Sequence, residues 1–156
     1  LDLPGDVLSE LDFVVASVHS RLDLPEAEMT ARLLRALDDP HVTMLGHPSN
    51  RLLLRREGSS FDLEAVLNKA REKGVIVELN CAPRRLDLDW RPLRDWLSAG
   101  NLTSVNPDAH DPAMLDFVRY GITIARKAWA TPASVLNTRS VEEVSEILSE
   151  RRARSS

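Results

Sequence analysis

The stretch DLEAVLNKAREKGVIVELN, residues 62–80, decides the fold class of this 156-residue chain. From Asp62 onward, apolar residues recur at the spacing of one helix face, and Gly74 is a typical residue for ending a helix. Residues 75–79 are almost all apolar and rich in β-branched side chains, which indicates a strand. A helix that leads directly into such a strand is the repeating unit of a parallel α/β sheet.

The same alternation of short strands and amphipathic helices continues on both sides of this stretch. Besides the strand at 75–79, it predicts a buried strand at 13–18 and further strands at 42–45 and 102–105, and it predicts helices at 25–39, 62–74 and 90–99. From Pro112 the chain is predicted to be helical to its end, with breaks near Gly121 and at Thr131-Pro132. We therefore expect one α/β domain over residues 1–156. Four parallel strands fit half of a closed barrel or a small open sheet, and the periodicity does not choose between them.

Composition excludes several classes of protein. No apolar run approaches the roughly 18 residues of a membrane span, and no charged-then-apolar leader opens the chain. The single cysteine, Cys81, cannot form an internal disulfide, which fits a reducing compartment, so we expect a soluble cytoplasmic protein without a membrane partner. The net charge of −4 means that binding to nucleic acid would need a local basic patch or a partner domain.

Polar side chains that suit metal chemistry follow the predicted strands. Because the carboxyl ends of parallel strands share one face, these side chains can converge although they are far apart in sequence. Imidazole and carboxylate together suit zinc, manganese or iron. The sequence thus suggests a metal site with four candidate ligands, which are His19, His47, Asp108 and His110.

Simpler interpretations of these residues remain open. A histidine at a strand end often bonds a backbone carbonyl, and Asn106-Pro107-Asp108 is typical of a turn in which the aspartate bonds the backbone. No closely spaced Cys or His pair supports the metal site independently. The fourth histidine, His41, precedes a strand and is expected at the surface.

Six short motifs follow one another along the chain: Ser17-Val18-His19, Gly46-His47-Pro48, Glu78-Leu79-Asn80, RLDLDW at 85–90, Asp108-Ala109-His110 and Arg119-Tyr120-Gly121. Together with RLLLRREG at 51–58 and ARKAW at 125–129, their order resembles the polymerase and histidinol phosphatase (PHP) domain of bacterial family X DNA polymerases. The resemblance covers nearly the whole chain.

This resemblance implies a distorted (β/α)₇ TIM-like barrel, of which the chain would be the C-terminal half. It also implies a multinuclear Mn²⁺ or Zn²⁺ cluster for phosphoester hydrolysis. Carried over by motif, His19 and His47 would bind one metal ion, Asp108 a second and His110 a third. The family's other ligands would precede Leu1, so we expect the chain alone to be inactive.

The function implied is 3′-5′ exonuclease or 3′-end processing in DNA repair, with DNA and the remainder of the same polymerase chain as partners. Two alternatives stay open. One is a histidinol-phosphatase-like enzyme for small molecules, and the other is a non-catalytic PHP domain that braces a polymerase.

Four residues are candidates for substrate binding: Asn80, Arg51, Arg55 and Arg56. The arginines follow His47 in a predicted loop, where they could hold a DNA phosphate by bidentate hydrogen bonds. The alternative is ion pairing with Glu57 and Asp62 on a solvated face.

Two other kinds of residue are assigned to structure. Cys81 is expected to be a partly buried, inert thiol and not a metal ligand. The tryptophans at 90, 96 and 129 lie at helical positions beside apolar residues, so we expect them in the core and not stacked on bases.

Overall fold

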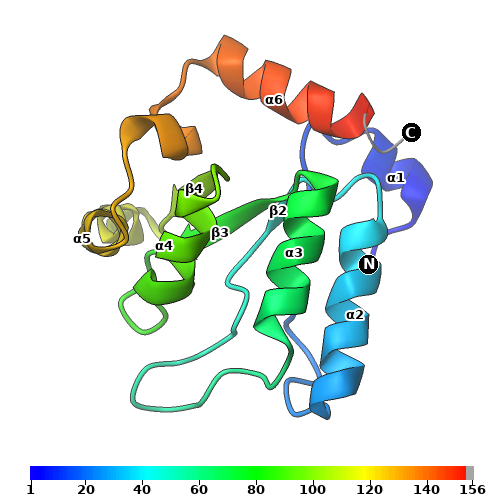
Figure 1. The fold of residues 1–156 in the computed structure, drawn as a ribbon, viewed down its shortest axis with the longest axis horizontal. Coiled ribbons are helices and arrows are strands. Elements are labelled where there is room, and N and C mark those ends of the chain that lie inside the picture. The colour runs from blue at the N-terminus through cyan, green and yellow to red at the C-terminus, as the bar shows by residue number, and fades with distance from the viewer. Residues whose placement is uncertain (154–156) are drawn as a thin grey trace.

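The computed structural model describes residues 1–153 and shows an α/β protein (Figure 1). In chain order, the longer elements are α1 (Gly5–Ser9), β1 (Val15–Ala16), α2 (Glu26–Asp38), β2 (Met44–Leu45), α3 (Leu63–Lys73), β3 (Ile76–Asn80), α4 (Trp90–Ser98), β4 (Thr103–Asn106), α5 (Val118–Lys127) and α6 (Val141–Ala153). Three 3₁₀ turns, Pro112–Phe117, Pro132–Ser134 and Leu136–Thr138, lie between β4 and α6.

The four strands form one parallel sheet in the order β1-β2-β3-β4. Helices α2, α3 and α4 make the crossovers between successive strands and lie in one layer over the sheet (Figure 1). This arrangement confirms the predicted fold class of an α/β protein with a parallel sheet. It also brings the carboxyl ends of all four strands to one end of the sheet.

Local sequence explains where the crossover helices begin and end. The Asp62 carboxylate accepts a hydrogen bond from the Ala65 amide at 2.9 Å, and Asp89 caps α4 in the same way through the Arg91 amide at 3.0 Å. Gly74 ends α3 with a φ of 66°, a conformation that costs glycine little. These caps place β3 and the loop before α4.

The core lies between the helix layer and the sheet. Met29, Leu37, Val66 and Leu79 are fully buried there, and every residue of β3 is buried. Helix α6 crosses the opposite end of the sheet from the long 46–62 loop, where it covers the starts of β2 and β3 (Figure 1). The end that carries the candidate site is therefore left uncovered by α6.

The first strand is shorter and more exposed than the sequence predicts. Only Val15 and Ala16 pair with β2, whereas the expected strand ran from residue 13 to 18. Phe13 is 55% exposed and Val15 is 43% exposed. Since β1 is an edge strand, it has a neighbouring strand on one side only among the described residues. The expectation of a buried strand is wrong for the exposed residues of this segment.

Gly121 does not break the helical region, contrary to the sequence-based prediction. It lies inside α5, where a Cβ atom would collide with the Sγ atom of Cys81 and would come within 3.0 Å of Val105 Cγ1. Glycine at this position therefore permits close packing of α5 on the sheet. The predicted break at Thr131-Pro132 is confirmed, because α5 has ended and Pro132 opens a 3₁₀ turn.

The tryptophans divide between core and surface. Trp96 is buried and donates its indole N–H to the Leu102 carbonyl at 2.9 Å, and Trp90 is half-buried against the core. Trp129 is 67% exposed, so its assignment to the core is wrong. It follows the end of α5 with a positive φ of 61°, which turns it out of the helix's apolar face.

Among residues 1–153, no helix is both long enough and apolar enough to span a membrane. The predicted helix at the end of the chain is found as α6, and its expected continuation over residues 154–156 lies outside the described residues.

Candidate metal and phosphate site

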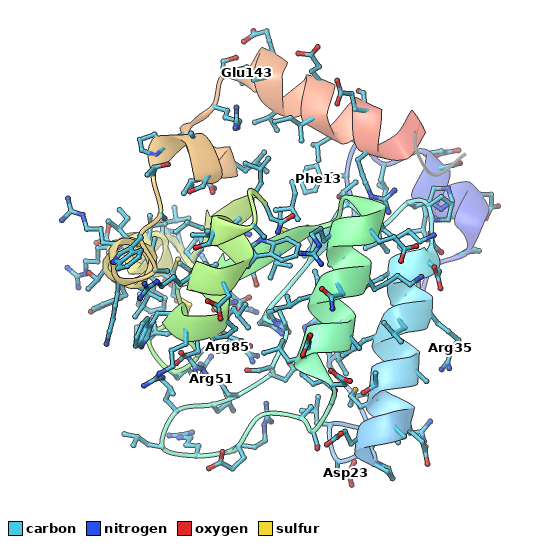
Figure 2. The ribbon with its side chains drawn as sticks, viewed as in Figure 1. Phe13, Asp23, Arg35, Arg51, Arg85 and Glu143 are labelled. Atoms are coloured by element: carbon cyan, nitrogen blue, oxygen red, sulfur yellow. The ribbon has the colours of Figure 1, made fainter. Side chains whose placement is uncertain are left out.

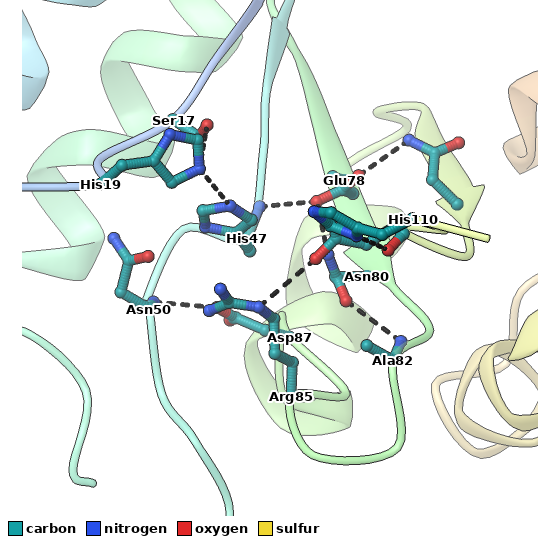
Figure 3. Close-up of polar contacts among 12 residues, drawn as sticks. Ser17, His19, His47, Asn50, Glu78, Asn80, Ala82, Arg85, Asp87 and His110 are labelled. Atoms are coloured by element: carbon teal, nitrogen blue, oxygen red, sulfur yellow. Dashed lines mark hydrogen bonds and ion pairs between the residues drawn. The ribbon is translucent and has the colours of Figure 1, made fainter. Parts of the chain in front are cut away.

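The carboxyl ends of β1 and β2 bring His19 and His47 together (Figure 3). Their Nε2 atoms are 3.1 Å apart and their ring centroids are 5.1 Å apart. The Ser17 hydroxyl lies 3.2 Å from the same nitrogen of His19. Two histidines from neighbouring loops thus present ring nitrogens to one point.

Gly46 makes this approach possible. It follows β2, and a Cβ atom there would lie 3.0 Å from Val15 Cγ1 and 3.4 Å from Ser17 Cβ. The absence of a side chain lets the β2 loop pass close to β1. The next residue, His47, then turns with a positive φ of 28° and is only 5% exposed.

Glu78 in the middle of β3 holds the loops on either side. Its Oε2 accepts the His47 amide at 2.7 Å, and its Oε1 accepts the Asn106 amide group at 2.9 Å. Burial raises the pKa of Glu78. The sequence analysis gave Glu78 no role, although a carboxylate inside an otherwise apolar strand is a signal for one.

Asp108 lies near the histidine pair and is held by Arg85. The Asp108 Oδ2 atom is 3.4 Å from Arg85 Nε, and Asp108 has a positive φ of 53°. The charge of Arg85 lowers the pKa of His47 and that of Asp108 raises it, and Asp108 follows β4 at the same end of the sheet as the two histidines. The predicted ligands His19, His47 and Asp108 therefore gather at one edge of the sheet.

Among residues 1–153, no hydrogen bond joins His110 to the histidine pair. Its side chain is exposed, and its Nδ1 lies 2.8 Å from the Asp108 carbonyl oxygen. This is the backbone contact that the sequence left open as the simpler alternative. His41 lies outside the group, because its Nδ1 contacts Asp39 at 2.9 Å and its side chain is partly exposed.

The histidine pair has the chemistry of a metal-binding group. Burial and, to a smaller extent, the positive charge of Arg85 together lower the pKa of His47 to about 4, so the ring is neutral near pH 7. Neutral imidazole is the form that binds metals. The buried Nδ1 of His47 has no hydrogen-bond partner among the described residues.

The separation of the two nitrogens also fits a shared ion. Ligand nitrogens at 2.0–2.1 Å from a tetrahedral Zn²⁺ lie about 3.3 Å from each other, close to the 3.1 Å observed between the Nε2 atoms. Among residues 1–153, however, no three His, Cys, Asp or Glu side chains are grouped closely enough to hold a metal ion. The pair fits part of a metal site and does not complete one.

Arg85 carries a free donor beside the pair. Its side chain is 17% exposed, and its buried Nη1 has no hydrogen-bond partner among the described residues. A buried guanidinium nitrogen without a partner favours an anion at that place. Sequence reasoning missed this residue, because arginine is too common in the chain to stand out.

Asp87 fixes the loop that follows His47. Its buried carboxylate accepts the Ser49 and Asn50 amides, each at 3.0 Å, and the Ser49 hydroxyl at 2.9 Å. Burial raises the pKa of Asp87, while the bond from Ser49 acts in the opposite direction. This residue was also missed, although an aspartate between Leu86 and Leu88 indicates a buried, hydrogen-bonded carboxylate.

Arg51 anchors the same loop from the other side. Its Nε donates to the Arg85 carbonyl at 2.8 Å, its Nη1 pairs with Asp89 at 3.2 Å, and its Nη2 donates to the Leu86 carbonyl. The guanidinium is thus engaged in holding two loops together. The structure gives Arg51 a positioning role in place of the expected phosphate contact.

Arg55 and Arg56 project from the tip of the loop. Both are exposed, and Arg56 donates to the Asn50 carbonyl at 2.8 Å. Within residues 1–153, neither makes an ion pair with Glu57 or with Asp62, which caps α3 instead. Residues 49 and 51–58 line a cavity of about 620 Å³. Both arginines therefore keep donors for an external anion.

Asn80 and Cys81 end β3 without facing solvent. The fully buried Asn80 amide group donates to Glu78 at 3.3 Å and accepts the Ala82 amide at 3.1 Å, so it positions the loop rather than offering itself to a substrate. Cys81 is fully buried as well, and burial raises the pKa of its thiol to about 12. That environment fits the expected inert thiol.

No protein-family model matches the chain. Over 95% of its length it is 40% identical to the DNA polymerase/3′-5′ exonuclease PolX of Bacillus subtilis strain 168, and it covers 26% of that protein. It is 29% identical to a probable phosphatase of Thermoanaerobacter sp. strain X514, over 97% of this chain and 63% of the phosphatase. A probable phosphatase of Clostridium novyi strain NT is 38% identical over 51% of the chain and 31% of its own length.

By sequence, the chain is thus a relative of proteins named as probable phosphatases. Its match to PolX runs over nearly its full length, so it is homologous to a segment of a family X DNA polymerase/exonuclease, as the order of its motifs predicts. The chain spans about a quarter of that polymerase and less than two thirds of the phosphatases.

Proposed function

We propose that this chain is the C-terminal portion of a PHP domain that hydrolyses phosphoesters at DNA 3′ ends, as a 3′-5′ exonuclease working in DNA repair. The observation that carries the proposal is the His19–His47 pair, 3.1 Å apart, beside a buried arginine nitrogen without a partner. Two side chains that can bind a metal ion and one that can bind an anion thus lie at the same end of the sheet. Relatives named as an exonuclease and as phosphatases support hydrolysis of a phosphoester as the shared reaction.

The proposed cofactor is a Mn²⁺ or Zn²⁺ cluster. His19 and His47 would hold one ion, Asp108 and His110 would contribute to others, and residues outside this chain would complete the cluster. When bound, the metal supplies Lewis-acid stabilisation of the phosphate oxygens. The neutral ring of His47 is ready for this role without losing a proton.

The chain's own residues would orient the phosphate and the ligands. Glu78 holds the His47 backbone at 2.7 Å, which fixes the direction of its ring. The free Nη1 of Arg85 would donate to a phosphate oxygen and thereby neutralise charge next to Asp108. Asp87 and Arg51 would keep the loop after His47 in place.

DNA would be held mainly by Arg55 and Arg56 at the tip of this loop. Both side chains are exposed in the loop that follows His47, and an arginine binds a phosphate oxygen pair bidentately. These contacts would position the strand without reading its sequence.

The proposed architecture is half of a (β/α)₇ barrel. The exposed apolar side chains of Phe13 and Val15 at the open edge of β1 support further strands there, contributed by the remainder of the polymerase chain. Residues 1–156 would then form one continuous part of that domain. We place its action in the cytoplasm, in keeping with a buried thiol that is not in a disulfide.

A direct test compares substrates on the full-length protein. Release of nucleotides from a 3′-labelled primer should require Mn²⁺ or Zn²⁺ and should fall about a hundredfold or more in Arg85→Ala, because a charged contact in a dry site is lost. Hydrolysis of histidinol phosphate in preference to the primer would favour the alternative of a small-molecule phosphatase. The match to 63% of a probable phosphatase is the observation that supports this alternative. No hydrolysis of either substrate would favour the non-catalytic alternative.

A further inference from the structure

One surface on α4 and at the end of α5 combines the exposed ring of Trp129 and the half-buried ring of Trp90 with cations. We call it the tryptophan-cation surface, and it consists of Trp90, Arg91, Arg94, Lys127 and Trp129. The Arg94 guanidinium lies 3.2 Å from the centroid of the Trp129 ring. Arg91 and Lys127 each lie 4.7 Å from the centroid of the Trp90 ring. Two ring-cation groups therefore adjoin along α4.

Trp129 is the exposed member of this surface. It is 67% exposed, it has a positive φ of 61°, and Arg94 covers one of its faces. Trp129 combines a left-handed backbone conformation with an exposed indole ring. Both features lower the stability of the fold, because the backbone is strained and the large apolar ring is not buried. The ring area that Arg94 leaves uncovered is available for stacking.

The cations of this surface keep unbalanced charge. Arg91 pairs with Asp89 at 3.2 Å, but within residues 1–153 neither Arg94 nor Lys127 forms an ion pair with a carboxylate. This contrasts with the net charge of −4 for the whole chain. Their resting contacts are with rings, which leaves their charge free to attract an anion.

The tryptophan-cation surface is connected to the candidate site through one ion pair. Asp89 precedes Trp90 and pairs with Arg51 of the loop after His47 at 3.2 Å. Figure 2 shows Arg51 and Arg85 close together near the start of α4. A strand that leaves the site along α4 therefore meets Trp90 first and then the Arg94–Trp129 pair.

We propose that this surface binds single-stranded nucleic acid, with one base stacked on Trp129 and the neighbouring phosphates held by Arg94 and Lys127. Aromatic faces take any base, and adjacent cations take the backbone, which is how proteins hold single strands without sequence preference. The substrate class rests on the proposed function. The surface would guide the unpaired 3′ strand of a DNA end toward the histidine pair.

Binding of a fluorescein-labelled dT₁₂ to the full-length protein, measured by anisotropy, tests this proposal. Trp129→Ala should weaken binding about tenfold, and Trp129→Phe should weaken it less, because a smaller ring still stacks. Arg94→Ala should lower the slope of log affinity against log salt by about one unit. Leu115→Ala, which removes another exposed apolar side chain, should leave affinity unchanged and serves as the matched control.

Two further readouts separate the outcomes. Hydrolysis of bis-p-nitrophenyl phosphate should be unchanged in Trp129→Ala, since that small substrate does not reach α4. If the proposed function alone is wrong, the wild-type protein will not hydrolyse this substrate, and the binding measurement will still test the surface. Bound dT₁₂ should quench an indole emission that Trp129→Phe removes. Wild-type affinity and quenching in the Trp129 variants would overturn the proposal. A lowered Tm of Trp129→Ala together with wild-type affinity would overturn it in favour of a purely structural role of the Arg94–Trp129 contact.

Discussion

The Nε2 atoms of His19 and His47 lie 3.1 Å apart, although 28 residues separate the two histidines in the chain. The parallel pairing of Ala16 with Leu45 sets this relationship, because each histidine follows its strand by two or three residues. Gly46 then removes the side chain that would hold the two loops apart. The strand register and a glycine thus bring the two histidine side chains together.

The loop arginines give the first prediction. Replacing Arg55 and Arg56 together with Ala should weaken binding of duplex DNA and lower its salt slope by up to about two units, about one for each lost phosphate contact. Titrations between low and moderate salt measure this slope in the full-length protein. Arg35→Ala, a change of an arginine on α2, is the control. An unchanged slope would return the two arginines to a merely solvated face.

Asp87 is predicted to stabilise the loop after His47. Asp87→Ala leaves the Ser49 and Asn50 amides without their acceptor, and we expect the free energy of unfolding to fall by about 3 kcal/mol. Urea denaturation measures the change. Asp116→Ala removes an exposed carboxylate of the same type and should cost less than about 0.5 kcal/mol. Equal effects of the two substitutions would show that the Asp87 bonds do not stabilise the fold.

The thiol of Cys81 should react slowly in the folded protein. Burial raises its pKa from 9.0 to about 12, so at pH 8 the thiolate fraction is about a thousandfold lower than in the unfolded chain. Alkylation by iodoacetamide, followed by mass spectrometry with and without urea, tests this difference. The sign for stability follows from the raised pKa: between pH 9 and pH 12 the unfolded chain loses the thiol proton first, so stability falls as pH rises. Equal alkylation rates in both states would contradict the buried environment.

A side chain at position 121 should destabilise the fold. Gly121→Ala places a Cβ atom against Cys81 Sγ and near Val105, and we expect a loss of about 1–3 kcal/mol from overpacking. Cys81→Ala in the same chain should recover part of this loss, which a double-mutant cycle measures. Thr123→Ala, on the same helix but exposed, is the control. Additive effects of the Gly121 and Cys81 substitutions would mean that α5 does not pack as described.

The sequence predicts the alternating elements well because their signals are local. The apolar spacing and caps around Asp62 and Gly74 define α3 and β3 without reference to the rest of the chain. The extent of β1 depends instead on having a neighbour on each side, which a local pattern does not contain. The helical path through Gly121 likewise depends on a contact with Cys81 from another element.

In the candidate site, too, some residues can be predicted from local sequence and others depend on contacts between distant segments. His19 and His47 could be found from sequence, because residues after parallel strands share an edge. The roles of Glu78 and Asp87 depend on hydrogen bonds across the sheet, and that of Arg85 on a nitrogen left without a partner. The placement of Trp129 at the surface follows from one backbone turn after α5 that apolar periodicity does not encode.

If the histidine pair belongs to a metal-dependent phosphoesterase site, then His47→Ala in the full-length protein should abolish hydrolysis at DNA 3′ ends. Degradation of a 3′-labelled primer with Mn²⁺ should fall about a thousandfold, since loss of a Lewis-acid site costs several kcal/mol of transition-state stabilisation. Asp108→Ala should behave in the same way, DNA polymerase activity should persist in both variants, and His41→Ala should retain full degradation because His41 lies outside the site. Degradation by His47→Ala within tenfold of the wild-type rate would contradict the account.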